Sequence, residues 1–296
     1  MSEAGASPVA DPMVDEERSR AARTRAERAL CTLAAHVADD NAPLIVLGGL
    51  MPEILTEGRE TGPPHLGTTD VDMLLVAHLE HTEDLRRIEA ALELAGFCAE
   101  SGNNGWRWRG IVDGFAVKLE FLCDLDTEPE GIVAIPGCQT LRANNLRGTG
   151  YVAADWTVRE LTTDLPGLGL TTVRVRFAGL EGYLLTKCVA VRHRGKDKDH
   201  YDLAFVLIHN RAGGPTAAAR QLLDGKLADR LRALRSTFLE VRERFYSVDS
   251  QGPKGFAAES SRADPSARED ENRALAVAAV NEFIEALLAG DGHAPR

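Results

Sequence analysis

The 296-residue chain has few cysteines and no long apolar run. Its five cysteines, at positions 31, 98, 123, 138 and 188, are odd in number and form no Cys-x-x-Cys pair. This pattern favours reduced thiols over a disulfide framework or a zinc site. Apolar runs such as Leu44–Met51 and Met73–Ala77 are far shorter than the roughly 20 residues of a membrane-spanning helix. The first residues also lack the basic and apolar stretches of a secretory signal, so we expect a cytoplasmic protein without membrane contact.

An excess of basic residues is also absent. Lys and Arg number 34 against 45 Asp and Glu, which gives a net charge of −11. A protein that coats nucleic acid non-specifically needs the opposite balance, because Lys and Arg must neutralise the phosphates. The chain is long enough for one or two domains, and 44% of its residues are hydrophobic, which suits a globular core.

Hydrophobic periodicity predicts a sheet with helices packed on it, followed by a mostly helical region. Short apolar runs at 44–47 and 70–76 indicate buried strands, and Asp113-Gly114 indicates a hairpin turn between two more strands. The residues of the final helix follow a stretch rich in Gly, Ser and Pro. We therefore divide the chain into a disordered terminus (1–14), a sheet-containing core (15–135), a second, mainly helical region (136–248), a flexible linker (249–271) and a C-terminal helix (272–296).

Two carboxylates stand close together in Asp70-Val71-Asp72. On a strand, residues i and i+2 point to the same face, so both acids project side by side. Like charges this close repel unless a cation compensates them, and hard oxygen ligands suit Mg²⁺. Taken alone, the more ordinary interpretation is a pair of solvent-facing acids.

A third acid, Glu120, interrupts the apolar run Phe115–Leu122. A carboxylate in such a run needs a partner, and a metal ion would provide one. Glu120 is then a third ligand and a base for an attacking hydroxyl. The alternative is an ion pair with Lys118 on an edge strand. Asp124 and Asp126 are competing candidates for the third acid.

A glycine pair, Gly48-Gly49, ends the first predicted strand. Glycines let backbone amides approach a phosphate closely, and the start of the following helix attracts one. The alternative is a tight turn from strand to helix without a ligand.

Lys187 lies on the apolar stripe of a predicted helix over 180–194. A lysine on that stripe indicates a charged ligand. Five bases and one acid occupy positions 187–198, which favours a triphosphate or an RNA backbone as partner. The alternative is a solvated helix–loop–helix with ordinary ion pairs. The five bases are Lys187, Arg192, Arg194, Lys196 and Lys198.

Together these residues resemble the nucleotidyltransferase superfamily, in which a strand ending in a glycine pair precedes an Asp-x-Asp strand and a later third acid. More specifically, the sequence is similar to the AbiEii/AbiGii toxin family. That family carries Lys-x-x-Ala, then an arginine, then a [Arg/Lys]-Asp-x-x-Asp helix. The corresponding residues here are Lys187-Cys-Val-Ala190, Arg192 or Arg194, and Lys198-Asp199-His-Tyr-Asp202, with His65-x-Gly-Thr-Thr-Asp70 leading into the strand.

The resemblance implies an α+β fold with a nucleotidyltransferase-like mixed sheet, flanking helices and a mostly helical C-terminal region. It implies transfer of a nucleoside monophosphate from an NTP to an acceptor hydroxyl, such as the 3′ end of a tRNA or other RNA. The protein would be the toxin of a toxin–antitoxin pair with a cognate antitoxin. Asp70, Asp72 and Glu120 would hold two Mg²⁺ ions. Nucleotide contacts would come from Gly48, Gly49, Thr69, Lys187, Asp199 and Asp202, with Lys187 also offsetting charge in the transition state.

Two other functions stay open. The first is an adenylyltransferase acting on a small cationic molecule such as an aminoglycoside, which fits the acidic balance of the chain. The second is a non-catalytic nucleotide-binding or protein-interaction module.

Overall fold

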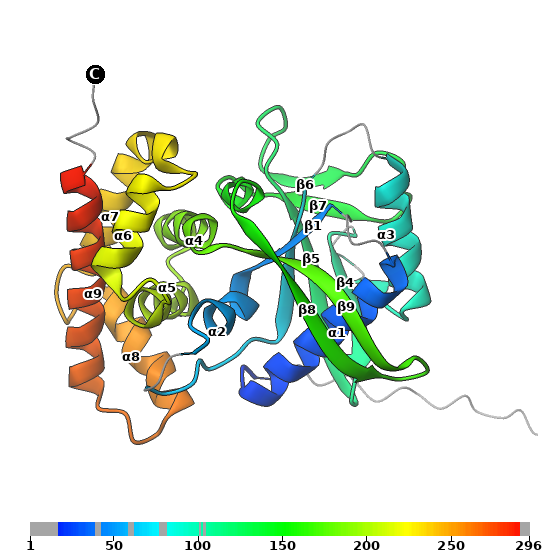
Figure 1. Ribbon diagram of the computed structural model, residues 1–296, viewed down its shortest axis with the longest axis horizontal. Helices are drawn as coiled ribbons and strands as arrows, with labels where there is room; N and C mark the ends of the chain where they lie inside the picture. The colour runs from blue at the N-terminus through cyan, green and yellow to red at the C-terminus, as the bar shows by residue number, and fades with distance from the viewer. Residues whose placement is uncertain are drawn as a thin grey trace, which may run out of the picture.

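In the computed structural model the chain forms an α+β protein in which a mixed sheet and a group of helices lie side by side (Figure 1). The structure describes residues 17–38, 43–58, 62–76, 82–100, 102 and 105–290. The predicted disorder of residues 1–14 lies outside these ranges. The predicted α+β class, with its mixed sheet, flanking helices and helical C-terminal part, is confirmed.

The first part, which we call the sheet lobe, carries the strands and three helices. Its elements are α1 (Arg20–Val37), β1 (Leu44–Leu47), α2 (Met51–Leu55), β2 (Asp70–Leu75), α3 (Thr82–Leu94), β3 (Cys98–Ala99), β4 (Arg107–Val112), β5 (Phe115–Cys123), β6 (Gly131–Ala134), β7 (Arg142–Asn145), β8 (Trp156–Leu165) and β9 (Gly169–Ala178). The second part, the helical lobe, holds α4 (Leu180–Arg194), α5 (Asp197–His209), α6 (Pro215–Asp224), α7 (Arg235–Arg244), α8 (Gln251–Ala263) and α9 (Glu269–Gly290).

The strands follow the order β3-β4-β5-β2-β1-β9-β8, with β7 and β6 joined to the end of β5. β2 runs parallel to β5 and antiparallel to β1. Asp113 and Gly114 both have positive φ, as the predicted two-residue hairpin between β4 and β5 requires. α1 packs on the sheet with Ala26, Leu30 and Leu33, so one face of β2 points into the apolar core.

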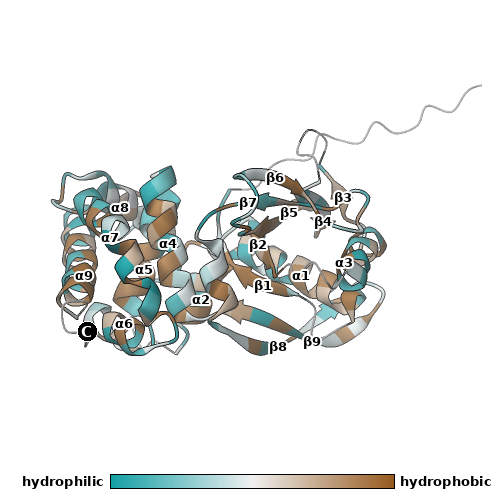
Figure 2. Ribbon diagram, turned by 90° about the horizontal axis from the view of Figure 1, so that it is seen from above, coloured by the Kyte–Doolittle hydropathy of each residue, from teal (hydrophilic) through white to brown (hydrophobic). Residues whose placement is uncertain are grey.

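The two lobes meet along α4, α5 and α2. α2 lies between the sheet and the helical lobe in both views (Figures 1 and 2). α5 is buried along most of its length and contacts α4, α8 and α9. Its polar residues are therefore forced into the interior, where they need partners.

The sheet extends further along the chain than predicted. Strands β7, β8 and β9 belong to it, so the helical part begins at Leu180 and not at residue 136. The β8–β9 ribbon keeps one face open to solvent, so its apolar residues do not form the continuous run that marks a buried strand.

The predicted flexible linker over 249–271 contains α8. This helix packs against α5 and α9 and buries Phe256 and Ala257. Its glycines serve close packing: a Cβ on Gly252 would lie 2.6 Å from the ring of Phe245. Composition alone indicated a linker because small residues serve both flexible segments and tight helix contacts. The final helix begins at Glu269, and residues 291–296 lie outside the described ranges.

All five cysteines lie in described parts of the chain and are free thiols. Burial raises the pKa of Cys188 to about 12. Across the described ranges, no helix has the length and apolar character to cross a bilayer.

Candidate functional site

Three carboxylates line up on one face of the central sheet. The parallel register of β2 and β5 pairs Asp70 with Lys118 and Asp72 with Glu120. Paired residues on adjacent strands share a face and lie about 5 Å apart, whereas Val71 points into the core. The structure therefore brings together the three predicted acids, which we call the acid row: Asp70, Asp72 and Glu120.

The acid row carries uncompensated negative charge at its centre. Burial, together with the charges of Asp70 and Glu120, raises the pKa of Asp72 to about 7. Asp70 behaves differently: although burial works in the opposite direction, Lys198 and a hydrogen bond from Thr68 lower its pKa. The hydroxyl of Thr68 donates to Asp70 Oδ1 at 2.5 Å. Asp72 is thus the member of the row that most lacks a cation.

The geometry favours Glu120 over its two competitors for the third acid. Asp124 accepts hydrogen bonds from the backbone of Gly148 and Gly150 at 2.8 and 2.9 Å, so it stabilises the turn after β7. The side chain of Asp126 is fully exposed. Glu120 lies in register with Asp72, and its carboxylate receives Arg107 of β4 at 2.6 Å.

The glycine pair forms a corner directly against the acid row. Gly48 has a φ of +74°, and a Cβ there would lie 1.9 Å from Asp72 Oδ2. A Cβ on Gly49 would lie 2.5 Å from Thr68 Oγ1. The corner therefore requires glycine because the acid row and its lead-in approach so closely. The following helix α2 has only five residues. Thr69 is half-buried and directly precedes β2.

Lys187 on α4 lies between two carboxylates of α5. Its ammonium donates to Asp202 Oδ2 at 2.8 Å and to Asp199 Oδ1 at 3.1 Å. Asp199 and Asp202 share one face of α5 because they are three residues apart. All three side chains are at most 6% exposed. We call these residues the lysine cluster, and they explain a lysine on an otherwise apolar stripe.

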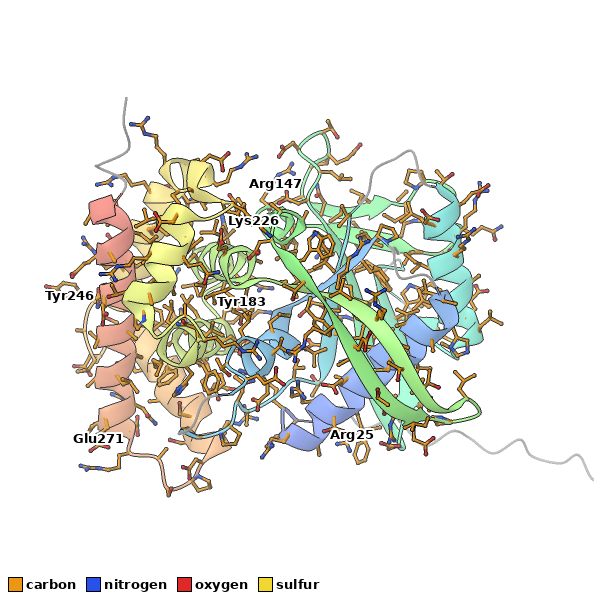
Figure 3. The ribbon with its side chains drawn as sticks, in the orientation of Figure 1. Arg25, Arg147, Tyr183, Lys226, Tyr246 and Glu271 are labelled. Atoms are coloured by element: carbon orange, nitrogen blue, oxygen red, sulfur yellow. The ribbon has the colours of Figure 1, made fainter. Side chains whose placement is uncertain are left out.

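Charge in the lysine cluster is compensated. Although burial acts against it, the charges of Lys187 and Arg18 hold the pKa of Asp202 well below its usual range. Against the effect of burial, Lys187 and Arg194 also lower the pKa of Asp199, whose Oδ2 atom is buried without a hydrogen-bond partner. Tyr183, one helical turn before Lys187, lies on α4 (Figure 3), and its hydroxyl is likewise buried and unpartnered.

Lys198 reaches the acid row from α5. Its ammonium lies 3.8 Å from Asp70 Oδ2, and its side chain is 37% exposed. The predicted basic cluster otherwise separates: Arg192 turns to Glu240 of α7, and Arg194 turns to Asp199. Lys187, Arg194 and Lys198 therefore contact acids of the site, and of these three Lys198 contacts the acid row.

Arg18 enters the site, although no sequence pattern predicts it there. Its guanidinium donates to Asp202 Oδ1 at 3.0 Å. His65 Nε2 lies 3.0 Å from the same oxygen, and burial lowers the pKa of His65, so the neutral ring donates there. His65 belongs to the motif that leads into β2, but no local pattern distinguishes Arg18, which lies 184 positions from its partner.

The donor set suits Mg²⁺, since it consists of carboxylate oxygens with an excess of negative charge at Asp72. Within the described ranges, no group of three or more His, Cys, Asp or Glu side chains is already arranged around a common metal position. Asp70 and Glu120 instead turn to Lys198 and Arg107. Holding a metal would require these two side chains to exchange a basic partner for the ion.

Two cavities among the described residues lie outside the acid row. One, of about 510 Å³, lies between α1 and β9 and includes Val46 and Met73. The other, of about 590 Å³, is lined by residues of α1, α2 and β8.

A scan against models of known protein families finds no match, and a search of curated proteins also finds none.

Proposed function

We propose that this protein is a Mg²⁺-dependent nucleotidyltransferase that transfers a nucleoside monophosphate from an NTP to an acceptor hydroxyl. The observation that carries the proposal is the acid row: three carboxylates in register on two parallel strands, against a glycine corner. The raised pKa of Asp72 supports it, because an acid left without a cation suits a site that receives one.

Asp70, Asp72 and Glu120 would hold the metal. Bound Mg²⁺ would neutralise triphosphate charge and make the acceptor hydroxyl easier to deprotonate. Glu120 takes the proton of that hydroxyl, whose oxygen then attacks the α-phosphorus. The bond from the α-phosphorus to the bridging oxygen breaks, and pyrophosphate leaves with the electron pair. The corner of Gly48 and Gly49, with Thr69 beside it, gives the nucleotide room.

The two lysines take different parts in this proposal. The ammonium of Lys187 is held by Asp199 and Asp202, so it acts through its electric field, which partly opposes the rise in the pKa of Asp72. Lys198 is more exposed and faces Asp70. We therefore assign direct phosphate contact to Lys198 and electrostatic support to Lys187, with Asp199 and Asp202 fixing its position.

The resemblance to the AbiEii/AbiGii toxin family implies an RNA acceptor, such as the 3′ end of a tRNA, and a role as the toxin of a pair with a cognate antitoxin in the cytoplasm, and we include both in the proposal. A direct test incubates the protein with Mg²⁺, labelled NTPs and bulk tRNA. Wild type and the exposed-acid control Asp126→Asn should transfer label, and Asp70→Asn/Asp72→Asn should not. Transfer that survives in the double variant would contradict the assignment of the acid row.

The net charge of −11 favours one alternative, a small cationic acceptor. Replacing tRNA by amine-bearing compounds such as aminoglycosides distinguishes the two acceptors. NTP binding without pyrophosphate release, with either acceptor, would instead indicate a non-catalytic nucleotide-binding module.

A further inference from the structure

We infer that Arg18, in the segment before α1, is a positioning residue that fixes Lys187 through Asp202 and holds the lead-in of β2 against the helical lobe. The expected effect of Arg18 on catalysis rests on the proposed function. Its expected effect on the position of Lys187 rests on the contacts of Arg18 alone.

The guanidinium of Arg18 joins three separate parts of the fold. Nε donates to the carbonyl of Gly67 at 2.9 Å, Nη2 to Asp202 of α5 at 3.0 Å, and Nη1 to Glu259 of α8 at 2.9 Å. Its side chain is 14% exposed. A planar, rigid fork of donors can satisfy three directions at once, which the single ammonium of a lysine does less well.

Asp202 transmits the position of Arg18 to Lys187. Its Oδ1 receives Arg18 and His65, and its Oδ2 receives Lys187 at 2.8 Å. Because a carboxylate is planar, donors that fix one oxygen also fix the direction of the other. Without Arg18, His65 alone holds Oδ1, so the Oδ2 acceptor of Lys187 is held in its direction by one donor instead of two.

The same arginine sets where β2 begins. Gly67 has a φ of +98°, and a Cβ there would lie 2.2 Å from the carbonyl oxygen of Ser19. The lead-in therefore lies directly against the segment that carries Arg18. Thr68 follows Gly67 and donates to Asp70. A shift of Gly67 after loss of its hydrogen bond from Arg18 would therefore also move Thr68 and its contact with the acid row.

The kinetic test compares Arg18→Ala and Arg18→Lys with Arg262→Ala. Arg262 is a matched control because it also contacts Glu259, at 3.0 Å, through a different oxygen. We expect Arg18→Ala to lower kcat at least tenfold with the KM for NTP within about twofold, and Arg18→Lys to recover little. Non-denaturing guanidinium chloride should restore part of kcat to Arg18→Ala. Arg262→Ala should resemble wild type.

A second measurement does not depend on catalysis. Lysine acylation read by mass spectrometry reports access to Lys187, and thiol alkylation of Cys188, its buried neighbour, reports general opening of α4. We expect Lys187 to react severalfold faster in Arg18→Ala than in wild type or Arg262→Ala, with Cys188 unchanged.

Unchanged acylation of Lys187, or equal acceleration at Cys188, would overturn the inference. So would a kcat of Arg18→Ala equal to that of Arg262→Ala in an active enzyme. Faster acylation of Lys187 in a protein whose wild type transfers no nucleotide would refute the proposed function and leave the structural role of Arg18 supported.

Discussion

The acid row on the sheet and the lysine cluster between α4 and α5 use the same residue types to opposite effect. In the lysine cluster, Asp202 contacts Lys187 and Arg18, and its pKa is well below the usual range. In the acid row, Asp72 lies beside two other acids, and its pKa rises to about 7. Compensated carboxylates hold a structure together, whereas an uncompensated one stores repulsion that a bound cation relieves. The lysine cluster therefore contains acids that hold basic side chains in position, whereas the acid row contains an acid suited to binding a cation.

The largest expected effect comes from breaking the compensated side. Asp202→Asn leaves Lys187 and Arg18 buried near one remaining acid of α5. Loss of one partner from a buried pair costs about 3–5 kcal/mol. We expect the midpoint of thermal unfolding to fall by roughly 10 °C, since 1 kcal/mol corresponds to about 2–4 °C in a chain of this size class. Differential scanning calorimetry checks this. A fall in the unfolding midpoint of less than about 2 °C would contradict the stabilising role of Asp202 that distinguishes the lysine cluster from the acid row.

The uncompensated side should respond with the opposite sign. Asp72→Asn removes a repelled charge, so at pH 8 with EDTA we expect a gain on the order of 2 kcal/mol in the free energy of unfolding. Transfer activity should nevertheless fall by roughly 10²–10³-fold, the range for loss of a group that stabilises developing charge. Chemical denaturation and the transfer assay measure the two quantities. Destabilisation by Asp72→Asn would contradict the assignment of stored repulsion.

The pH dependence sharpens this difference. A carboxyl whose pKa is raised in the folded state destabilises the fold above its unfolded pKa of about 4, and the cost grows until about pH 7. Wild type and Asp72→Asn should therefore be about equally stable near pH 4. The advantage of the variant should widen up to about pH 7 and then level off. Urea unfolding of both proteins at several pH values, without divalent metal, measures the gap. A gap that stays constant with pH would count against Asp72 as its source.

The smallest effect on stability is expected at Lys198, because its side chain is partly exposed. Lys198→Gln should leave the unfolding midpoint within about 2 °C but raise the KM for NTP about tenfold, as expected for a phosphate contact of about 1.4 kcal/mol. Lys254→Gln, on α8, serves as the control. An unchanged KM for NTP in Lys198→Gln would contradict the assignment of the phosphate contact to Lys198 and favour Lys187 in that role.

Sequence patterns predicted the part of the site that depends on local spacing. Asp70 and Asp72 share a face because the strand period is two, and Asp199 and Asp202 share one because the helix period is 3.6. The parallel register places Glu120 beside Asp72, and its role as third acid stays a prediction.

The remainder depends on contacts that local patterns do not encode. Arg18 contacts Asp202 across 184 positions of the chain, and its place just before the start of α1 gives no sign of that partner. The residues of α8 are typical of a linker because they include Gly252 and Gly255. In the structure these glycines instead allow close packing against other elements. The position of Lys187 on an apolar stripe indicated a charged partner. That partner is the pair of acids on the next helix, to which Lys187 donates.

The most direct test of the acid row as the receiving side is a titration with Mn²⁺, a paramagnetic substitute for Mg²⁺, followed by electron paramagnetic resonance. Wild type and Asp126→Asn should bind the ion with equal affinity, and Asp72→Asn should lose at least tenfold in affinity. Equal binding by Asp72→Asn and wild type would contradict the assignment of the acid row as the metal site.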